Sequence, residues 1–175
     1  MKKRLLLFLG AVLCLCAAPK LHAQTPSVNS QVGFPVNAKN GVQVAYGNSK
    51  YVLLGGYNGT ASLNSLYSST TATSWNLIAT NNLVTTQLNN IAFGAGLFVV
   101  VGNDGIIQTS ADGINWTTRT SGTDKHLNRV YFINNQFFAA GTRRTLLTSA
   151  DGIAWTTIAF NAGSPTDQFM SVAYG

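Results

Sequence analysis

Residues 109–118 read TSADGINWTT, and residues 148–157 read TSADGIAWTT. The two stretches differ at a single position, and they belong to a longer match. When residues 91–129 are aligned with residues 130–168 without a gap, 12 of the 39 positions are identical. An aromatic and glycine pattern that is shared over this length is typical of a tandem structural repeat.

Two looser copies extend the repeat in both directions. One copy begins at Val44 and reaches Trp75, and another begins at residues 172–175, which read VAYG. The tryptophans of successive copies, Trp75, Trp116 and Trp155, fall at nearly equal spacings along the chain. The repeat therefore has a period of roughly 40 residues, a length typical of folds built from one repeated unit.

Each unit has the residue pattern of short β-strands. Residues 51–54, 99–101 and 130–133 are apolar runs rich in β-branched and aromatic side chains, bounded by Gly, Asn, Ser and Asp. No helical periodicity is sustained after residue 23. For the second unit, the pattern predicts strands at 90–93, 97–102 and 106–109, a fourth strand starting at Trp116, and turns at 94–96, 103–105 and 112–113.

Four short antiparallel strands in about 40 residues make one blade of a β-propeller. The sequence therefore predicts an all-β propeller with about three complete blades and the first strand of another. The expected blades span residues 44–80, 90–120 and 129–159, with the start of the next at 171–175. Three blades do not close a ring, so we expect an incomplete ring and the N-terminal part of a longer protein. Residues 24–43 are expected to supply at most one ring-closing strand, near residues 31–36.

The segments at residues 110–116 and 149–155 resemble the Asp-box, or BNR, repeat of sialidase-type propellers. They are also similar to the repeats of the photosystem II assembly factor and related exported propellers. The resemblance implies that each segment is the turn between the third and fourth strands of a blade. Both segments have one residue fewer between Asp and Gly than the usual box, and the first copy, at residues 69–75, has neither Asp nor Gly.

The residues of the box have structural roles that follow from their chemistry. An Asp at the start of a tight turn accepts hydrogen bonds from backbone N–H groups two or three positions on, and a Gly allows a positive φ. A Trp at the start of the outer strand fills space between neighbouring blades. The residues expected in these roles are Ser110, Asp112, Gly113, Trp116, Ser149, Asp151, Gly152 and Trp155.

The N-terminal segment, residues 1–23, has the pattern of an export signal. Lys2, Lys3 and Arg4 precede an apolar stretch that is too short to span a bilayer, and Ala23 provides a small residue for cleavage. We therefore expect a secreted or periplasmic bacterial protein without a membrane span. Lipidation of Cys16 is an alternative, which Leu15 disfavours because such sites prefer a small residue before the cysteine.

Removal of the signal changes the composition of the chain. Both cysteines are lost, and the formal net charge falls from +6 to +2 because seven basic and five acidic residues remain. The composition therefore excludes a disulfide framework, a thiol nucleophile and a Cys-based metal site. It also excludes a highly charged nucleic-acid-binding protein.

A group of cationic side chains is predicted on one face of the propeller. Loops that join the second strand to the third, and loops that join successive blades, emerge on the same face. We expect these loops or their ends to carry Lys125, His126, Arg129, Arg143 and Arg144. Our hypothesis is that this face binds an anionic or polyhydroxyl partner, since arginine offers a planar fork to carboxylates. The alternative is that these residues are solvated loop charges, offset by Asp104 and Asp124.

No catalytic residue set is predicted. Sialidases need a Tyr nucleophile assisted by Glu, and most other glycosidases need a carboxylate pair, but the chain has no Glu. Asp112 and Asp151 recur on separate blades, and His126 is the only His after residue 23. No cluster of metal ligands and no phosphate-binding loop indicates a cofactor.

The sequence therefore predicts an exported, non-catalytic β-propeller module for binding or assembly, with a carbohydrate or a protein as its ligand. The alternative is the N-terminal fragment of a sialidase-like glycoside hydrolase. That alternative requires an acid and a nucleophile beyond Gly175.

Overall fold

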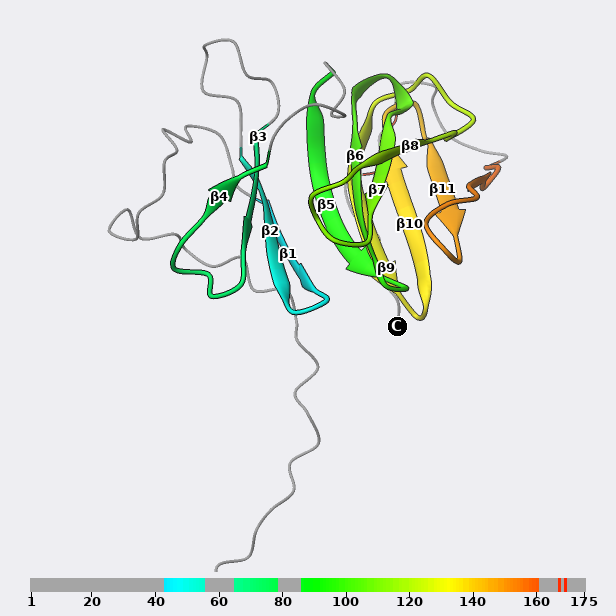
Figure 1. The fold of residues 1–175 in the computed structure, drawn as a ribbon. Coiled ribbons are helices and arrows are strands. Elements are labelled where there is room, and N and C mark those ends of the chain that lie inside the picture. The colour runs from blue at the N-terminus through cyan, green and yellow to red at the C-terminus, as the bar shows by residue number, and fades with distance from the viewer. Residues whose placement is uncertain (1–42, 56–64, 79–85, 161–166, 168, 170–175) are drawn as a thin grey trace, which may run out of the picture.

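The computed structural model describes residues 43–55, 65–78, 86–160, 167 and 169. These residues form twelve strands in three four-stranded antiparallel sheets. Each sheet is built from strands that are consecutive in the chain, and the three sheets stand side by side in chain order (Figure 1).

The strands of the first sheet are β1 (Gln43–Gly47), β2 (Lys50–Gly55), β3 (Ser65–Ser69) and β4 (Asn76–Leu77). The strands of the second sheet are β5 (Leu88–Gly94), β6 (Leu97–Gly102), β7 (Ile107–Ser110) and β8 (Thr117–Arg119), with a single 3-10 turn, η1 (Asn103–Gly105), between β6 and β7. The strands of the third sheet are β9 (Leu127–Ile133), β10 (Gln136–Gly141), β11 (Leu146–Ser149) and β12 (Thr156–Thr157).

The strand positions in the second sheet follow the predicted pattern closely. Strand β6 spans the predicted residues, and the ends of β5 and β7 differ from the prediction by one or two residues. The fourth strand differs, because β8 begins at Thr117 and Trp116 is the last residue of the preceding turn. Trp75 and Trp155 stand directly before β4 and β12 in the same way.

The first two strands of each sheet are joined by a turn of two residues that both have positive φ. This is the type I′ geometry, which matches the right-handed twist of a β-hairpin. Asn and Gly tolerate it best, and each of the three pairs, Asn-Ser, Ala-Gly and Asn-Asn, contains at least one of them. The turns are Asn48–Ser49 (φ 47 and 58), Ala95–Gly96 (φ 45 and 77) and Asn134–Asn135 (φ 49 and 58).

Apolar side chains on both faces of β6 join the three sheets. Phe98 and Val100 belong to the core between the first and second sheets, and Val99 and Val101 belong to the core between the second and third. All four are fully buried. Because successive side chains of a strand point to opposite faces, a strand between two neighbouring sheets must be apolar throughout.

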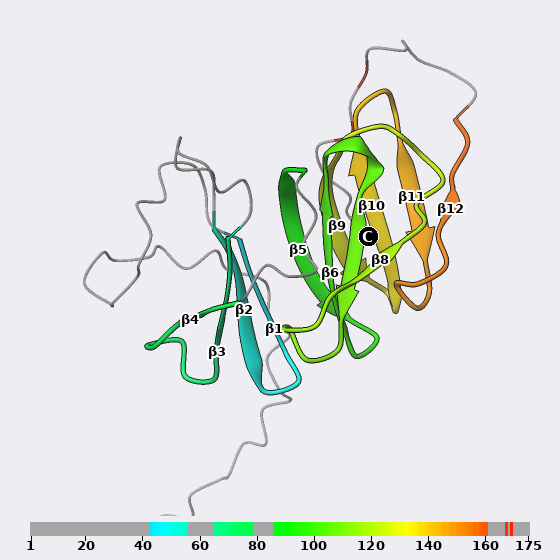
Figure 2. The same cartoon turned by 45° about the horizontal axis from the view of Figure 1, so that its top comes forward.

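The inner strands β1, β5 and β9 lie next to one another (Figures 1 and 2). Phe93 on β5 packs against Gly47 at the end of β1, and Phe132 on β9 packs in the same way against Gly94 at the end of β5. A Cβ atom at either glycine would overlap the facing ring. An aromatic ring on each inner strand therefore fits over a glycine of the preceding sheet.

Four-stranded antiparallel sheets that stack radially through their faces are blades of a β-propeller. The structure confirms the predicted all-β propeller architecture, with three consecutive blades in the described residues. The predicted export signal (1–23), ring-closing strand (31–36) and fourth-blade strand (171–175) lie outside the described residues. Within the part of the chain that is described, no helix is sufficiently long and apolar to reach across a bilayer.

Candidate functional site

Residues 69–75, 110–116 and 149–155 form three equivalent turns before the outer strands, here called the first, second and third box turns. In the second, Asp112 Oδ1 accepts hydrogen bonds from the Ser110 hydroxyl (2.9 Å) and from the backbone N–H groups of Ile114 and Asn115 (both 2.8 Å). The Asn115 side-chain amide donates to Oδ2 (2.8 Å). Both oxygens of the Asp112 carboxylate therefore accept hydrogen bonds from groups of the same turn.

The third box turn repeats this arrangement around Asp151. Its Oδ1 accepts hydrogen bonds from the Ser149 hydroxyl (3.0 Å) and from the backbone N–H groups of Ile153 (2.8 Å) and Ala154 (3.0 Å). The Ser149 hydroxyl oxygen accepts in turn from the Gly152 N–H (2.9 Å). Each carboxylate thus closes a turn that has no cross-strand partner of its own.

These hydrogen bonds lower the pKa of both carboxyl groups. For Asp112 the largest cause is the backbone N–H of Asn115, and for Asp151 it is the backbone N–H of Ala154. Donors that point at a carboxylate stabilise its charged form, so both groups stay ionised at neutral pH. A general acid must hold a proton at the working pH, and neither group is suited to that role.

Glycine and tryptophan complete the two turns. Gly113 and Gly152 have φ values of 69° and 75°, which a side chain disfavours. Trp116 is buried in the core between the first and second sheets, and Trp155 is half-buried against the core between the second and third. The Trp155 indole N–H donates to the carbonyl of Gly152 (3.0 Å), which ties the ring to its own turn.

The first box turn keeps the same shape with hydroxyl groups in place of the carboxylate. The Ser69 hydroxyl oxygen accepts hydrogen bonds from the backbone N–H groups of Thr71 (3.2 Å) and Ala72 (2.9 Å). The Thr71 hydroxyl lies 2.9 Å from that of Thr73. Ala72 has a φ of 62°, close to the values of the glycines in the other two turns. The turn therefore persists without the acid and with a strained alanine.

Replacing Ala72 with Gly is expected to raise the free energy of unfolding by about 0.5–1 kcal/mol, because glycine adopts a positive φ without the steric cost of a Cβ. Chemical denaturation of the two proteins measures the difference. Ala154 is the matched control: it lies in the third box turn without a positive φ, so Ala154→Gly should destabilise instead. Two changes of the same sign would contradict the strain at Ala72.

The loop between β8 and β9 lies beside the second-to-third-strand turns of two blades. The His126 side chain reaches the second blade, where its Nδ1 accepts the backbone N–H of Asp104 (3.1 Å). The His126 carbonyl accepts the backbone N–H of Thr142 (2.9 Å) in the third blade. One residue of the loop therefore joins the two turns, and the three segments share one face of the propeller, here called the loop face.

Charged side chains of both signs meet on the loop face. Lys125 forms an ion pair with Asp124, and the Asp104 carboxylate lies 3.7 Å from His126 Nδ1. The pKa of Asp124 is lowered, chiefly by the hydrogen bond from Lys125 and to a smaller extent by the positive charge of Arg143. Arg143 and the Asp124–Lys125 pair are therefore electrostatic neighbours although they belong to different loops.

Arg143 and Arg144 occupy the two central positions of the turn between β10 and β11. Their φ values are 53° and 56°, and the backbone N–H of Thr145 donates to the carbonyl of Thr142 (3.1 Å), which closes a type I′ turn. The second blade builds the equivalent turn from Asp104 and Gly105, with φ values of 56° and 69°. Asp-Gly suits this geometry and Arg-Arg does not, so the arginines cost conformational energy where they stand.

Arg129 is placed differently from the loop residues. It is the third residue of β9, and its Nη1 donates to the carbonyl of Asn128 (2.9 Å). By register it is equivalent to Asn90 on β5 and Gln43 on β1. Arg129 thus belongs to the inner strands and not to the inter-blade loop.

The amide side chains of the inner strands were missed by reasoning from the sequence. The Asn90 side chain donates to Gln43 Oε1 (3.2 Å) and accepts the backbone N–H of Val130 (3.0 Å), so it connects all three inner strands. Asn89 donates to the carbonyl of Leu127 (2.9 Å). Gln43, Asn90 and Arg129 fall at one position of the repeat. This alignment of polar residues was the signal in the sequence that could have indicated contacts between the inner strands.

No protein-family model matches the sequence, and no curated protein matches it. Among similar solved structures is one described as YCF48 bound to a D1 peptide, with 16% identity, a TM-score of 0.49, and coverage of 66% of this chain and 37% of that one.

Two glycoside hydrolases are similar at the same level. A structure of a GH130 enzyme that targets β-1,2-mannosidic linkages in Candida mannan has 14% identity and a TM-score of 0.45, with coverage of 69% of this chain and 48% of that one. A glycosyl hydrolase from Bacteroides ovatus has 15% identity and a TM-score of 0.45, with coverage of 73% and 50%. This chain therefore spans half or less of the length of each of these three structures.

Proposed function

We propose that this protein is an exported, non-catalytic propeller module for binding or assembly, and that its loop face binds an acidic partner, carbohydrate or protein. Residues 1–23 are the proposed export signal. The second and third box turns are proposed to be shortened Asp-boxes, whose carboxylates hold the turns and do not bind the partner of the loop face.

The observation that carries the proposal is the convergence of Lys125, His126 and the Arg143–Arg144 turn on one face from two successive blades. Guanidinium groups bind carboxylates in a planar, two-bonded geometry. The strained turn supports this choice, because Asp-Gly would satisfy the backbone better at the same position. Strain that is kept at a turn with an exposed Arg143 and a half-buried Arg144 favours a role for these side chains.

The ionisation state of Asp112 and Asp151 favours a binding function over a catalytic one. A glycosidase needs one carboxylic acid that keeps its proton and a second carboxylate beside it. Asp112 and Asp151 are each held by several donors in separate turns, and the pKa of each is lowered. The sialidase-like alternative would therefore have to draw its acid and nucleophile from residues other than these two.

The double variant Arg143→Asn/Arg144→Gly tests the proposal, because Asn-Gly is the preferred pair for a type I′ turn. It should raise the free energy of unfolding by about 1 kcal/mol and weaken binding at least tenfold. Binding is measured to poly-L-aspartate and polygalacturonate, with dextran as the neutral polymer. Preference for one of the two acidic polymers would separate a protein from a carbohydrate partner.

A charge-preserving variant is the matched control. Arg143→Lys/Arg144→Lys keeps both positive charges and loses the guanidinium forks, so its affinity should lie between those of the other two proteins. Affinity for the acidic polymer should also fall as salt is raised. Equal affinity of the wild type and the Asn-Gly variant, or no binding of the wild type to either acidic polymer, would refute the proposal.

A further inference from the structure

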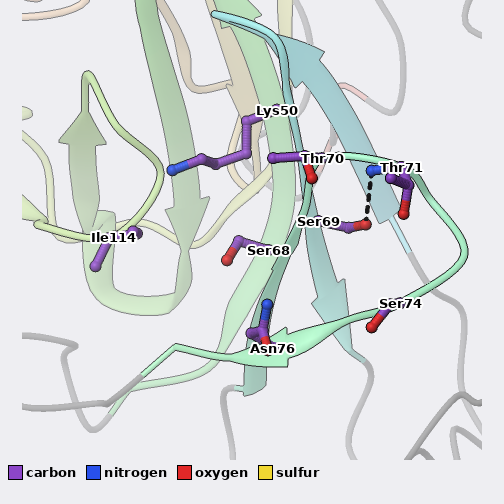
Figure 3. Close-up of a pocket in the computed structure, with 8 residues that line it drawn as sticks. All are labelled: Lys50, Ser68, Ser69, Thr70, Thr71, Ser74, Asn76 and Ile114. Carbon is purple, nitrogen blue, oxygen red and sulfur yellow. Dashed lines mark hydrogen bonds between the residues drawn. The ribbon is translucent and has the colours of Figure 1, made fainter.

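A groove lies at the outer rim of the propeller, at the seam between the first and second blades. It has a volume of about 380 Å³. Its walls are the end of β3, the first box turn and β4 on one side, and Ile114 of the second box turn on the other (Figure 3). The second box turn follows β7, and the 103–105 turn of the loop face precedes it, so the groove and the loop face lie at opposite ends of this strand.

The wall from the first blade is lined by small polar side chains. Five are hydroxyl residues and one is an amide: Ser68, Ser69, Thr70, Thr71, Ser74 and Asn76. No acidic side chain is among the lining residues. The groove is therefore rich in hydrogen-bond donors and carries no negative charge of its own.

Lys50 supplies a positive charge to the groove. Its side chain reaches from β2 toward the turn that carries Ile114, and Ser68 points to the same side (Figure 3). Lys50 Nζ donates one hydrogen bond, to the backbone carbonyl of Asp112 (2.8 Å). An ammonium group has three donors, and within the described residues the other two have no acceptor.

Ser68 and Ser69, which are consecutive on β3, line the groove in different ways, and Ser69 is the more buried of the two. Ser69 is 3% exposed, and its oxygen already accepts the backbone N–H groups of Thr71 and Ala72. This hydroxyl is turned toward Thr71, on the opposite side of β3 from the Ser68 hydroxyl (Figure 3), so it holds the turn and is not aimed at Lys50. Ser68, which is 9% exposed, also lines the groove. A donor as buried as Ser68 gains most from an acceptor that enters the groove.

The next seam, between the second and third blades, has different side chains at the equivalent positions. The repeat register places Leu97 where the first seam has Lys50, and Asp112 where it has Thr71. Thr109 replaces Ser68, and its hydroxyl accepts a hydrogen bond from Arg119 (2.9 Å). The first seam thus has a cation, Lys50, where the second has an apolar residue. It has a hydroxyl residue, Thr71, where the second has an acid.

We propose that the groove at the first seam is a binding site for an oxyanion, a carboxylate or a sulfate group on the ligand. Lys50 provides the charge, and Ser68 and Asn76 provide uncharged donors. The nearby Asp112 carboxylate does not compete for these donors, because its oxygens are occupied within the second box turn. The site is separate from the loop face and does not depend on the function proposed for that face.

The test is a titration of the full chain, followed by ¹⁵N–¹H NMR, with sodium sulfate, sodium glucuronate and glucose at matched ionic strength. Saturable shifts of the amide signals of residues 68–76 are expected with one or both anions and not with glucose. A response to sulfate alone would identify a sulfated ligand, and a response to glucuronate alone a carboxylate. No saturable shift with either anion, or an equal response to glucose, would overturn the proposal.

Two variants of Thr71 separate the charge effect from changes in folding. Thr71→Asp restores the acid of the other box turns, so it should preserve the turn and weaken anion binding at least tenfold. Thr71→Asn has nearly the same shape without the charge and should retain binding. Lys50→Met should abolish the shifts, and Ser68→Ala provides a second loss of donors that leaves the Lys50–Asp112 bond intact. Unchanged affinity in Thr71→Asp would refute the assignment.

Discussion

Replacing Gly94 with alanine is expected to lower the free energy of unfolding by about 3 kcal/mol, at the upper end of the usual cost of overpacking a core. A Cβ atom at this position would overlap the ring of Phe132 on the neighbouring inner strand. That ring also packs against Phe137, with 4.6 Å between ring centroids, so it cannot move away freely. The strain would fall on the seam between the second and third blades. Urea denaturation of the wild type and the variant measures the loss.

Phe132→Ala supplies the partner for a double-mutant cycle. If the Cβ destabilises through the ring alone, Gly94→Ala should cost little in a Phe132→Ala background, and the coupling energy should approach the full effect. Gly96→Ala is the control for backbone conformation, because Gly96 has a positive φ (77°) and no neighbour within 4 Å of its Cβ position. It should cost about 1 kcal/mol. Additive costs for Gly94→Ala and Phe132→Ala would show that the close fit is not what holds the blades together.

The strands were predictable because each one carries its own local signal. A run such as that of β6, which is apolar up to its final glycine, is bounded by turn residues on both sides and has a counterpart in β10, one repeat later. The repeat also identifies the box turns, since Ser110 and Asp112 recur as Ser149 and Asp151. Periodic patterns of this kind depend little on distant contacts, so they can be recognised in the sequence without knowledge of the fold.

The candidate sites depend on contacts between blades, and these have weaker signals in the sequence. Arg129 follows a loop and was grouped with it, but the strand begins two residues earlier, at Leu127. The groove at Lys50 was not predicted, because its two walls come from different blades and are far apart in the sequence. The sequence shows that the first box turn lacks an Asp. Only the structure shows that Lys50 lies at the same seam, so that the groove there has a positive charge and no acidic lining residue.

Asp112→Ala is expected to lower the free energy of unfolding at pH 7 by about 2 kcal/mol. The change removes a carboxylate that accepts two backbone N–H bonds, a hydroxyl bond and an amide bond, and hydrogen bonds to a charged group are stronger than neutral ones. The turn is near the surface, so water replaces part of the loss. Asp124→Ala is the matched control, because that carboxylate is solvent-exposed and its ion pair with Lys125 should contribute much less than the bonds of Asp112.

The same contacts predict how the effect of Asp112→Ala depends on pH. In the folded protein the pKa of Asp112 lies below the usual value of 3.8, chiefly because of the Asn115 backbone N–H. A group with a lowered folded pKa stabilises the protein fully above its unfolded pKa and loses that contribution as the pH falls toward the folded value. The difference in unfolding free energy between the wild type and Asp112→Ala should therefore be constant from pH 7 to about pH 5 and shrink below pH 4. Denaturation curves at pH 7, 5, 4 and 3 measure it, and a difference that stays constant to pH 3 would mean that the charge of Asp112 contributes nothing to the turn.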